Sequence, residues 1–190
     1  VNSVGKSLPG IELKISSDGE LCMRGPYVSN GFYKTKNSIS FKKGWFHSGD
    51  IFEQKDGHYF ILDRKKDIYK NSRGQTIAPQ KIENLFQDFD FIKSVFLVGD
   101  GKEYNTVLIY PNKEIPDFNF SEMSESQVHE IFSAMLISVN GFLSAFERIV
   151  SFSVIDRDFS SEKNELTQKG TFKRNNILKN FSNTIELMYK

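Results

Sequence analysis

The sequence contains only one cysteine and no long apolar run. Because Cys22 is the single cysteine among 190 residues, an internal disulfide is excluded and a reducing compartment is expected. No apolar stretch approaches the roughly 20 residues that a membrane-spanning helix needs. The formal net charge is +1, which gives no field that would attract nucleic acid or an anionic membrane. We therefore expect a cytoplasmic chain without a transmembrane segment or a nucleic-acid partner.

Several common patterns of catalytic and metal sites are also missing. His47, His58 and His129 stand far apart and show no metal-ligand spacing, so we expect no metal site. The sequence has no phosphate-binding P-loop and no Gly-x-Ser-x-Gly elbow. Cys22 lies in a segment with strand character, which favours a small core residue over a reactive thiol.

The composition and the first third of the sequence indicate a globular, β-rich start. Hydrophobic residues make up 38% and charged residues 26%, which is typical of a chain with a real core. Strands are expected at 11–15 and 20–26 as a hairpin. Two more, 50–54 and 58–63, are joined by the Asp-Gly turn at 56–57.

After about residue 66 the pattern becomes mixed and predicts a compact α+β domain over 67–190. Pro79 is expected in the first turn of a helix. Gly141 is a weak point in a longer helical pattern. The further expected elements are strands at 68–71, 92–100, 105–111 and 151–155, helices at 126–150 and 173–190, and polar loops at 112–124 and 156–170.

Two charged residues in the β-rich part are candidates for ligand binding. Asp50 follows a glycine at a strand start, and an ionised carboxylate can accept hydrogen bonds from two vicinal hydroxyls, as in a ribose. Its alternative interpretation is a turn-capping aspartate. Arg64 lies in the cluster Asp-Arg-Lys-Lys-Asp and offers a rigid fork of donors for hydroxyls or phosphate. The alternative for this cluster is a solvated charged face.

A third candidate is the loop Ser-Arg-Gly-Gln-Thr that precedes Pro79. Gly74 permits backbone angles closed to other residues, so that a ligand can approach the backbone there. The alternative is an ordinary connection between a strand and a helix.

These features together resemble the AMP-forming acyl-CoA synthetases, a branch of the adenylate-forming ligases. The run 44–83 is similar to the late motifs of that family, and 19–26 matches its Gly-Glu-Leu-x-x-Arg-Gly-Pro pattern. Residues 99–112 and 165–168 look most like the long-chain fatty acyl-CoA synthetases. The resemblance implies an α+β fold: 1–66 would be the last β-rich segment of a large N-terminal domain, and 67–190 the small mobile C-terminal domain.

The same resemblance implies roles for the candidate residues. Asp50 and Arg64 would contact the ribose of ATP and of the adenylate, and Lys66 would be the hinge between the two domains. The Gly74 loop would line the tunnel for the pantetheine arm of coenzyme A. The full-length parent would use a fatty acid, ATP, Mg²⁺ and coenzyme A, with peripheral membrane contact as an open possibility.

One position departs from the family. A loop lysine that stabilises the charge developing during adenylation is expected near the C-terminus, and such a donor is worth roughly 3 kcal/mol. Thr171 occupies its position, with Lys169 and Lys173 two residues to either side. Either one of these lysines serves in its place, or adenylation is impaired.

The family's phosphate loop, adenine-binding motif and acyl pocket do not occur in this sequence. We therefore expect a C-terminal fragment of an ATP-dependent fatty acid–CoA ligase that is inactive alone. The alternative is a non-catalytic, degenerate module that binds a partner or regulates a synthetase, which Thr171 favours. An aryl or amino acid substrate also stays open, because the acyl pocket is not in this sequence.

Overall fold

The computed structural model describes residues 3–29, 31, 34, 40–115, 120 and 122–190. The chain divides into two compact units, Val1–Ile68 and Tyr69–Lys190. The first unit is built from strands, and the second combines a sheet with helices, so the predicted α+β class is confirmed.

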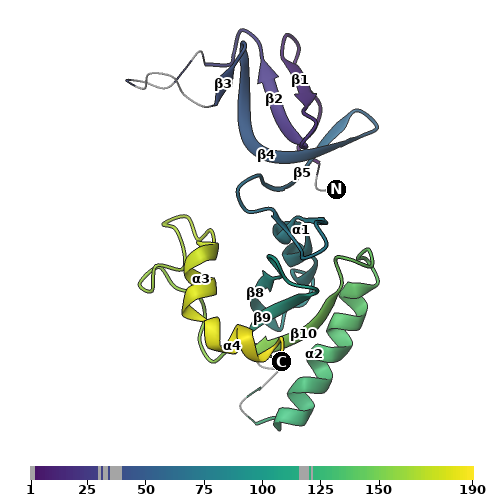
Figure 1. Ribbon diagram of the computed structural model, residues 1–190, viewed down its shortest axis with the longest axis vertical. Coiled ribbons are helices and arrows are strands. Elements are labelled where there is room, and N and C mark those ends of the chain that lie inside the picture. The colour runs from purple at the N-terminus through teal and green to yellow at the C-terminus, as the bar shows by residue number, and fades with distance from the viewer. Residues whose placement is uncertain (1–2, 30, 32–33, 35–39, 116–119, 121) are drawn as a thin grey trace. The chain divides into compact units, whose positions relative to one another are not determined.

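The first unit contains a five-stranded antiparallel sheet in the order β1-β2-β4-β3, with β5 also paired to β4 (Figure 1). Its strands are β1 (Glu12–Ile15), β2 (Glu20–Arg24), β3 (Phe41–Lys42), β4 (Trp45–Lys55) and β5 (His58–Arg64).

Local sequence signals in this unit are largely confirmed. Strands β1 and β2 form the predicted hairpin. Asp56 and Gly57 both adopt left-handed backbone angles, with φ of 51° and 76°, as a tight Asp-Gly turn requires. Cys22 is fully buried, as expected of a core residue. Strand β4 begins at Trp45 rather than Asp50, because its first residues pair with β2 and β3, which a local pattern does not reveal.

The second unit contains a three-stranded sheet in the order β10-β9-β8, in which β9 pairs antiparallel with β8 and parallel with β10. Its elements are β6 (Tyr69–Lys70), β7 (Thr76–Ile77), α1 (Pro79–Glu83), a 3₁₀ turn (Asn84–Phe86), β8 (Ile92–Val98), β9 (Asn105–Pro111), α2 (Glu125–Asn140), β10 (Ile149–Val154), α3 (Arg174–Asn180) and α4 (Ser182–Leu187).

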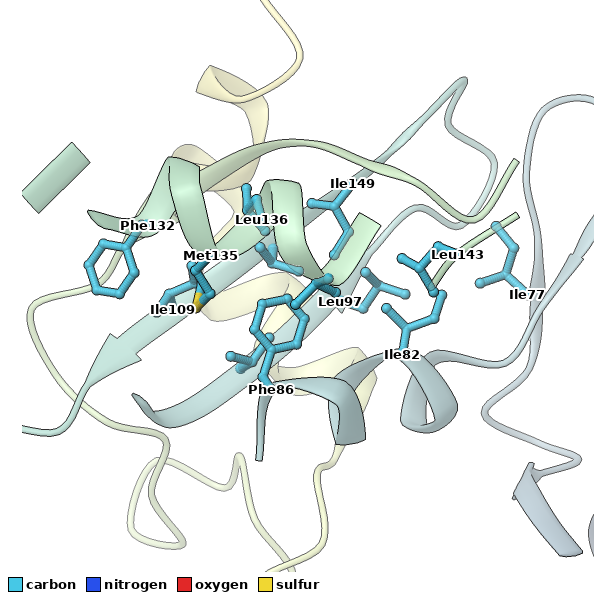
Figure 2. Packing of buried hydrophobic residues seen from close by; sticks show 13 residues of the cluster. Ile77, Ile82, Phe86, Leu97, Ile109, Phe132, Met135, Leu136, Leu143 and Ile149 are labelled. Carbon is cyan, nitrogen blue, oxygen red and sulfur yellow. The ribbon is translucent and has the colours of Figure 1, made fainter. Parts of the chain in front are cut away.

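This sheet is buried on both faces, since alternate residues of a strand point to opposite sides. Val95 and Leu97 of β8 join a cluster with α1 and α2, part of which Figure 2 shows around Leu97, Ile109 and Met135. Phe96 and Val98 join a second cluster with α3 and α4. The near-continuous apolar runs of β8 and β9 follow from this double coverage.

The predicted helix over 126–150 is wrong over residues 141–150. Helix α2 ends at Asn140, and Gly141 caps it by donating its N–H to the carbonyls of Ile137 and Ser138. Apolar residues after Gly141 continue the helical spacing, but Leu143 is buried from a loop while Phe142 is 79% exposed. Strand β10 begins at Ile149, within the predicted helix and before the predicted strand start at 151.

The predicted closing helix is two helices. Phe181 interrupts it with φ of −107°, outside helical values, between α3 and α4. The Phe181 ring is buried against Phe159, with 5.5 Å between ring centroids, so packing accounts for the break. None of the helices described, including α2, is long and apolar enough to cross a membrane.

Candidate functional site

Asp50 and Arg64, the two predicted ribose contacts, are direct cross-strand partners on β4 and β5. Directly opposed residues of an antiparallel pair project from the same face of a sheet. Asp50 is half-buried and Arg64 is exposed. Within the described part of the chain, neither side chain has a hydrogen-bond or ion-pair partner. A carboxylate acceptor and a guanidinium donor thus stand side by side and unengaged.

The backbone around this pair is held in place. Gly49 precedes Asp50 with φ of +78°, which a residue with a side chain rarely adopts. Ser48 accepts the Asp50 N–H at 3.1 Å and donates to the carbonyl of Leu21 at 2.8 Å. The Lys65 N–H donates to the Gly49 carbonyl at 2.8 Å, so that the residue before Asp50 is tied to the residue after Arg64.

A buried glutamate beside the pair was missed in the sequence. Glu20, at 5% exposure, accepts hydrogen bonds from His47 Nδ1, Lys65 Nζ and the Gly49 N–H, each at 2.9 Å. Burial raises its pKa, but the bonds from His47 and Lys65 outweigh burial and hold the pKa below its usual value. A usable signal was present, since Glu20 shares a strand face with Cys22, which was already expected in the core.

Cys22, His47 and Glu20 also form the kind of donor set that can bind a metal. Their ligand atoms lie within 4.8 Å of one another, and Cys22 Sγ is 3.4 Å from His47 Nδ1. Glu20, however, already accepts a hydrogen bond from the ammonium of Lys65. Burial, together with the negative charge of Glu20, raises the pKa of the Cys22 thiol, which disfavours the thiolate that a metal would need. Internal hydrogen bonds thus satisfy this set, and we assign no metal to it.

The two candidate lysines have different surroundings. Lys169 is exposed in a turn in which Thr167 and Thr171 pair through their backbones, with Thr167 N–H donating to Thr171 O at 2.8 Å. Among the described residues, the Lys169 ammonium has no partner. Lys173 instead donates to the side chain of Asn164, directly before α3. Thr171 is half-buried.

Buried ion pairs fix the chain before and after this turn. Glu165, fully buried, accepts two bonds from Arg157, at 2.7 and 2.8 Å. Burial alone would raise its pKa, but the Arg157 guanidinium lowers it to about 2. Beyond the turn, Arg174 forms a two-bond pair with Glu83, at 2.8 and 3.2 Å. The turn therefore projects from two anchored ends.

Gly74 lies in the loop between β6 and β7 with φ of +77°, and nothing stands within 4 Å of where a side chain would begin. Backbone angle rather than crowding accounts for a glycine here. The Ser72 N–H donates to the Lys102 carbonyl at 2.9 Å, so this loop lies against the turn after β8. Lys66 is exposed shortly after β5, close to the boundary at Ile68 between the two units. Its role as a hinge stays a prediction, as does the ligand contact of Gly74.

Comparison with known proteins gives consistent matches. Residues 66–190 match the family described as AMP-binding enzyme C-terminal domain. Fatty acyl-CoA synthetase B of Dictyostelium discoideum is 32% identical over 90% of this chain and 28% of its own length. Putative fatty-acid–CoA ligase fadD11 of Mycobacterium tuberculosis is 31% identical over 100% of this chain and 36% of its own length. This chain thus spans about a third of the length of these relatives.

Solved structures share the fold. The adenylation domain of a carboxylate reductase from Mycobacterium chelonae has a TM-score of 0.78 at 19% identity, over 97% of this chain and 31% of that one. O-succinylbenzoate coenzyme A synthetase from Bacillus subtilis, in complex with ATP and magnesium ion, has a TM-score of 0.63 at 21% identity, over 92% of this chain and 35% of that one.

Proposed function

The chain belongs to the AMP-binding enzyme C-terminal domain family, and we propose that it is the C-terminal part of an ATP-dependent fatty acid–CoA ligase. The predicted resemblance to acyl-CoA synthetases is thereby confirmed at the level of the family. One observation carries the proposal: Asp50 and Arg64 lie opposite each other with unengaged side chains.

In this proposal Asp50 and Arg64 hold the nucleotide by its ribose. The two oxygens of Asp50 accept the vicinal hydroxyls, because an ionised carboxylate is an acceptor only. Arg64 donates from the same sheet face to a ribose or phosphate oxygen. Mg²⁺ would accompany the ATP phosphates, and no residue of this chain is assigned to it. The phosphate loop and the acyl pocket would come from another part of the ligase.

We assign the adenylation lysine to Lys169 rather than Lys173. The Lys173 ammonium is engaged by Asn164, whereas Lys169 is exposed and unengaged among the residues described. A cation on an exposed turn with anchored ends can approach the phosphate as negative charge develops, which is where such a donor lowers the barrier. Lys66 would then act as the hinge about which the small domain rotates. Rotation would withdraw the Lys169 turn from the site after adenylation and bring in the Gly74 loop, beside which coenzyme A would bind.

A non-catalytic module is the second candidate, and Thr171 favours it. The expected lysine position carries a half-buried threonine whose carbonyl accepts the Thr167 N–H. If Lys169 does not replace the missing ammonium, the chain would bind a partner or regulate a synthetase instead.

The proposal is tested with Asp50→Ala in the full-length ligase that carries this chain. Loss of a charged hydrogen bond of about 1.5–3 kcal/mol should raise the KM for ATP by about 10- to 100-fold, with the KM for the fatty acid unchanged. Glu53→Gln is the matched control, since Glu53 lies on the same strand in an exposed pair with Lys55. Unchanged ATP kinetics in Asp50→Ala would refute the role of Asp50.

A further inference from the structure

Glu20 contacts the immediate neighbours of both proposed ribose residues. Its Oε1 accepts the N–H of Gly49, which precedes Asp50, and its Oε2 accepts the ammonium of Lys65, which follows Arg64. The third bond comes from His47, on the same strand as Gly49. One buried carboxylate thus joins β2 to the two points where β4 and β5 present the pair.

We propose that Glu20 is a positioning residue for the nucleotide ribose. It holds Gly49 and Lys65 so that the Asp50 carboxylate and the Arg64 guanidinium stay in place to bind the ribose hydroxyls. This inference rests on the proposed function. In the described part of the chain, the side chains of Asp50 and Arg64 have no hydrogen-bond or ion-pair partner, so their placement depends on the backbone around them. A site holds its geometry only when the groups around it are themselves fixed.

The position requires a carboxylate rather than any polar side chain. Two of its three donors meet Oε2, and the Gly49 N–H meets Oε1, so both oxygens are used. A glutamine has a single acceptor oxygen and would turn its own N–H₂ toward either Gly49 or Lys65. Glu20→Gln is therefore expected to break one arm of the arrangement while nearly preserving the volume of the side chain.

The competing interpretation is that Glu20 only stabilises the sheet. In that case its replacement lowers Tm, and nucleotide affinity measured well below Tm does not change. Glu12→Gln provides the control, because Glu12 pairs with Arg24 across β1 and β2 with both side chains exposed, at 60% and 47%. Replacing it removes an ion pair from the same sheet without touching Gly49 or Lys65.

The experiment uses the full-length ligase that carries this chain, with the ¹⁵N label confined to the residues of this chain and AMP as the probe. Amide hydrogen exchange by NMR should be at least about tenfold faster at Gly49 and Lys65 in Glu20→Gln than in wild type, the equivalent of about 1.4 kcal/mol. In an AMP titration of wild type, the amide chemical shifts of Asp50 and Arg64 should change and reach saturation. The Kd should rise by about tenfold in Glu20→Gln, and Glu12→Gln should match wild type in both measurements.

Each outcome decides between the claims. Absence of AMP-dependent shifts in wild type would overturn the ribose contact itself, and this inference with it. Shifts and Kd values that are equal in wild type and Glu20→Gln would overturn the positioning role alone and leave the proposed function standing. Should Glu20→Gln fail to fold, Lys65→Met removes one arm at an exposed residue, and an unchanged Kd in that variant would equally overturn the positioning role.

Discussion

Replacing Arg174 by methionine should destabilise the Tyr69–Lys190 unit by about 3–5 kcal/mol, because it leaves the charge of Glu83 buried without a cationic partner. The two side chains are only 13% and 9% exposed. Arg174 also donates to the Leu97 carbonyl at 2.8 Å, and the Leu97 N–H donates to Glu83 at 2.8 Å. The pair therefore joins α3, α1 and β8 in one network.

The assay is urea unfolding followed by two signals at once. The described helices all lie in the second unit, so far-UV circular dichroism follows that unit. Trp45, the only tryptophan, lies in the first unit, and its fluorescence provides an internal reference. The circular dichroism midpoint should fall sharply in Arg174→Met, with little change in the fluorescence midpoint.

Two further variants make the reasoning refutable. Lys93→Met breaks an exposed pair with Glu114, 44% and 80% exposed, and should change stability by less than about 1 kcal/mol. Combining Glu83→Gln with Arg174→Met should recover part of the loss, since no unpaired charge remains. An effect of Arg174→Met no larger than that of Lys93→Met would refute the account of a buried pair.

Three other results are expected. Because the folded pKa of Glu165 is about 2, against an ordinary value near 4.3, its stabilisation of about 3 kcal/mol is present above about pH 4.3 and is lost as pH falls toward 2. Between about pH 4.3 and 2 the urea midpoint of Glu165→Gln should accordingly fall less than that of wild type, since other carboxyls with lowered pKa values, such as Glu20, still titrate in the variant; an equal fall would contradict the role of Glu165. Gly99→Ala should lower the urea midpoint by the equivalent of about 1–3 kcal/mol, because its Cβ would overlap Oδ1 of the buried Asn105 and stand 2.6 Å from the Tyr69 hydroxyl; an unchanged midpoint would contradict that packing. Asn164→Ala should release Lys173 yet leave pyrophosphate release by the full-length ligase unchanged if Lys169 is the working lysine.

The sequence predicts the structure of this chain well where interactions between residues close in sequence determine it. The Asp56-Gly57 turn, the β1–β2 hairpin and the burial of Cys22 follow from residue type and alternation, and the structure has them. The same turn sets the pairing of β4 with β5 as far as Phe52 and Ile61. A register shift between Ile51 and Phe52 then moves the pairing by one residue and places Asp50 opposite Arg64, which the turn alone does not predict.

Features decided by distant partners were not readable in this way. Glu20 meets His47 and Lys65 across 27 and 45 positions of the chain, and only the folded sheet brings them together. Glu165 was expected in a polar loop but is fully buried, because Arg157 supplies a matching charge. The end of α2 was misjudged because apolar residues after Gly141 serve a loop and a strand while keeping helical spacing.

Pyrophosphate release by the full-length ligase that carries this chain, with ATP, Mg²⁺ and a panel of fatty acids, tests the central claim most directly. We expect release that depends on the fatty acid, is lost in Lys169→Ala and is retained in Lys173→Ala. Loss in Lys173→Ala alone would contradict the assignment of the lysine. No release from wild type with any fatty acid would contradict the ligase proposal and favour the non-catalytic module that Thr171 suggests.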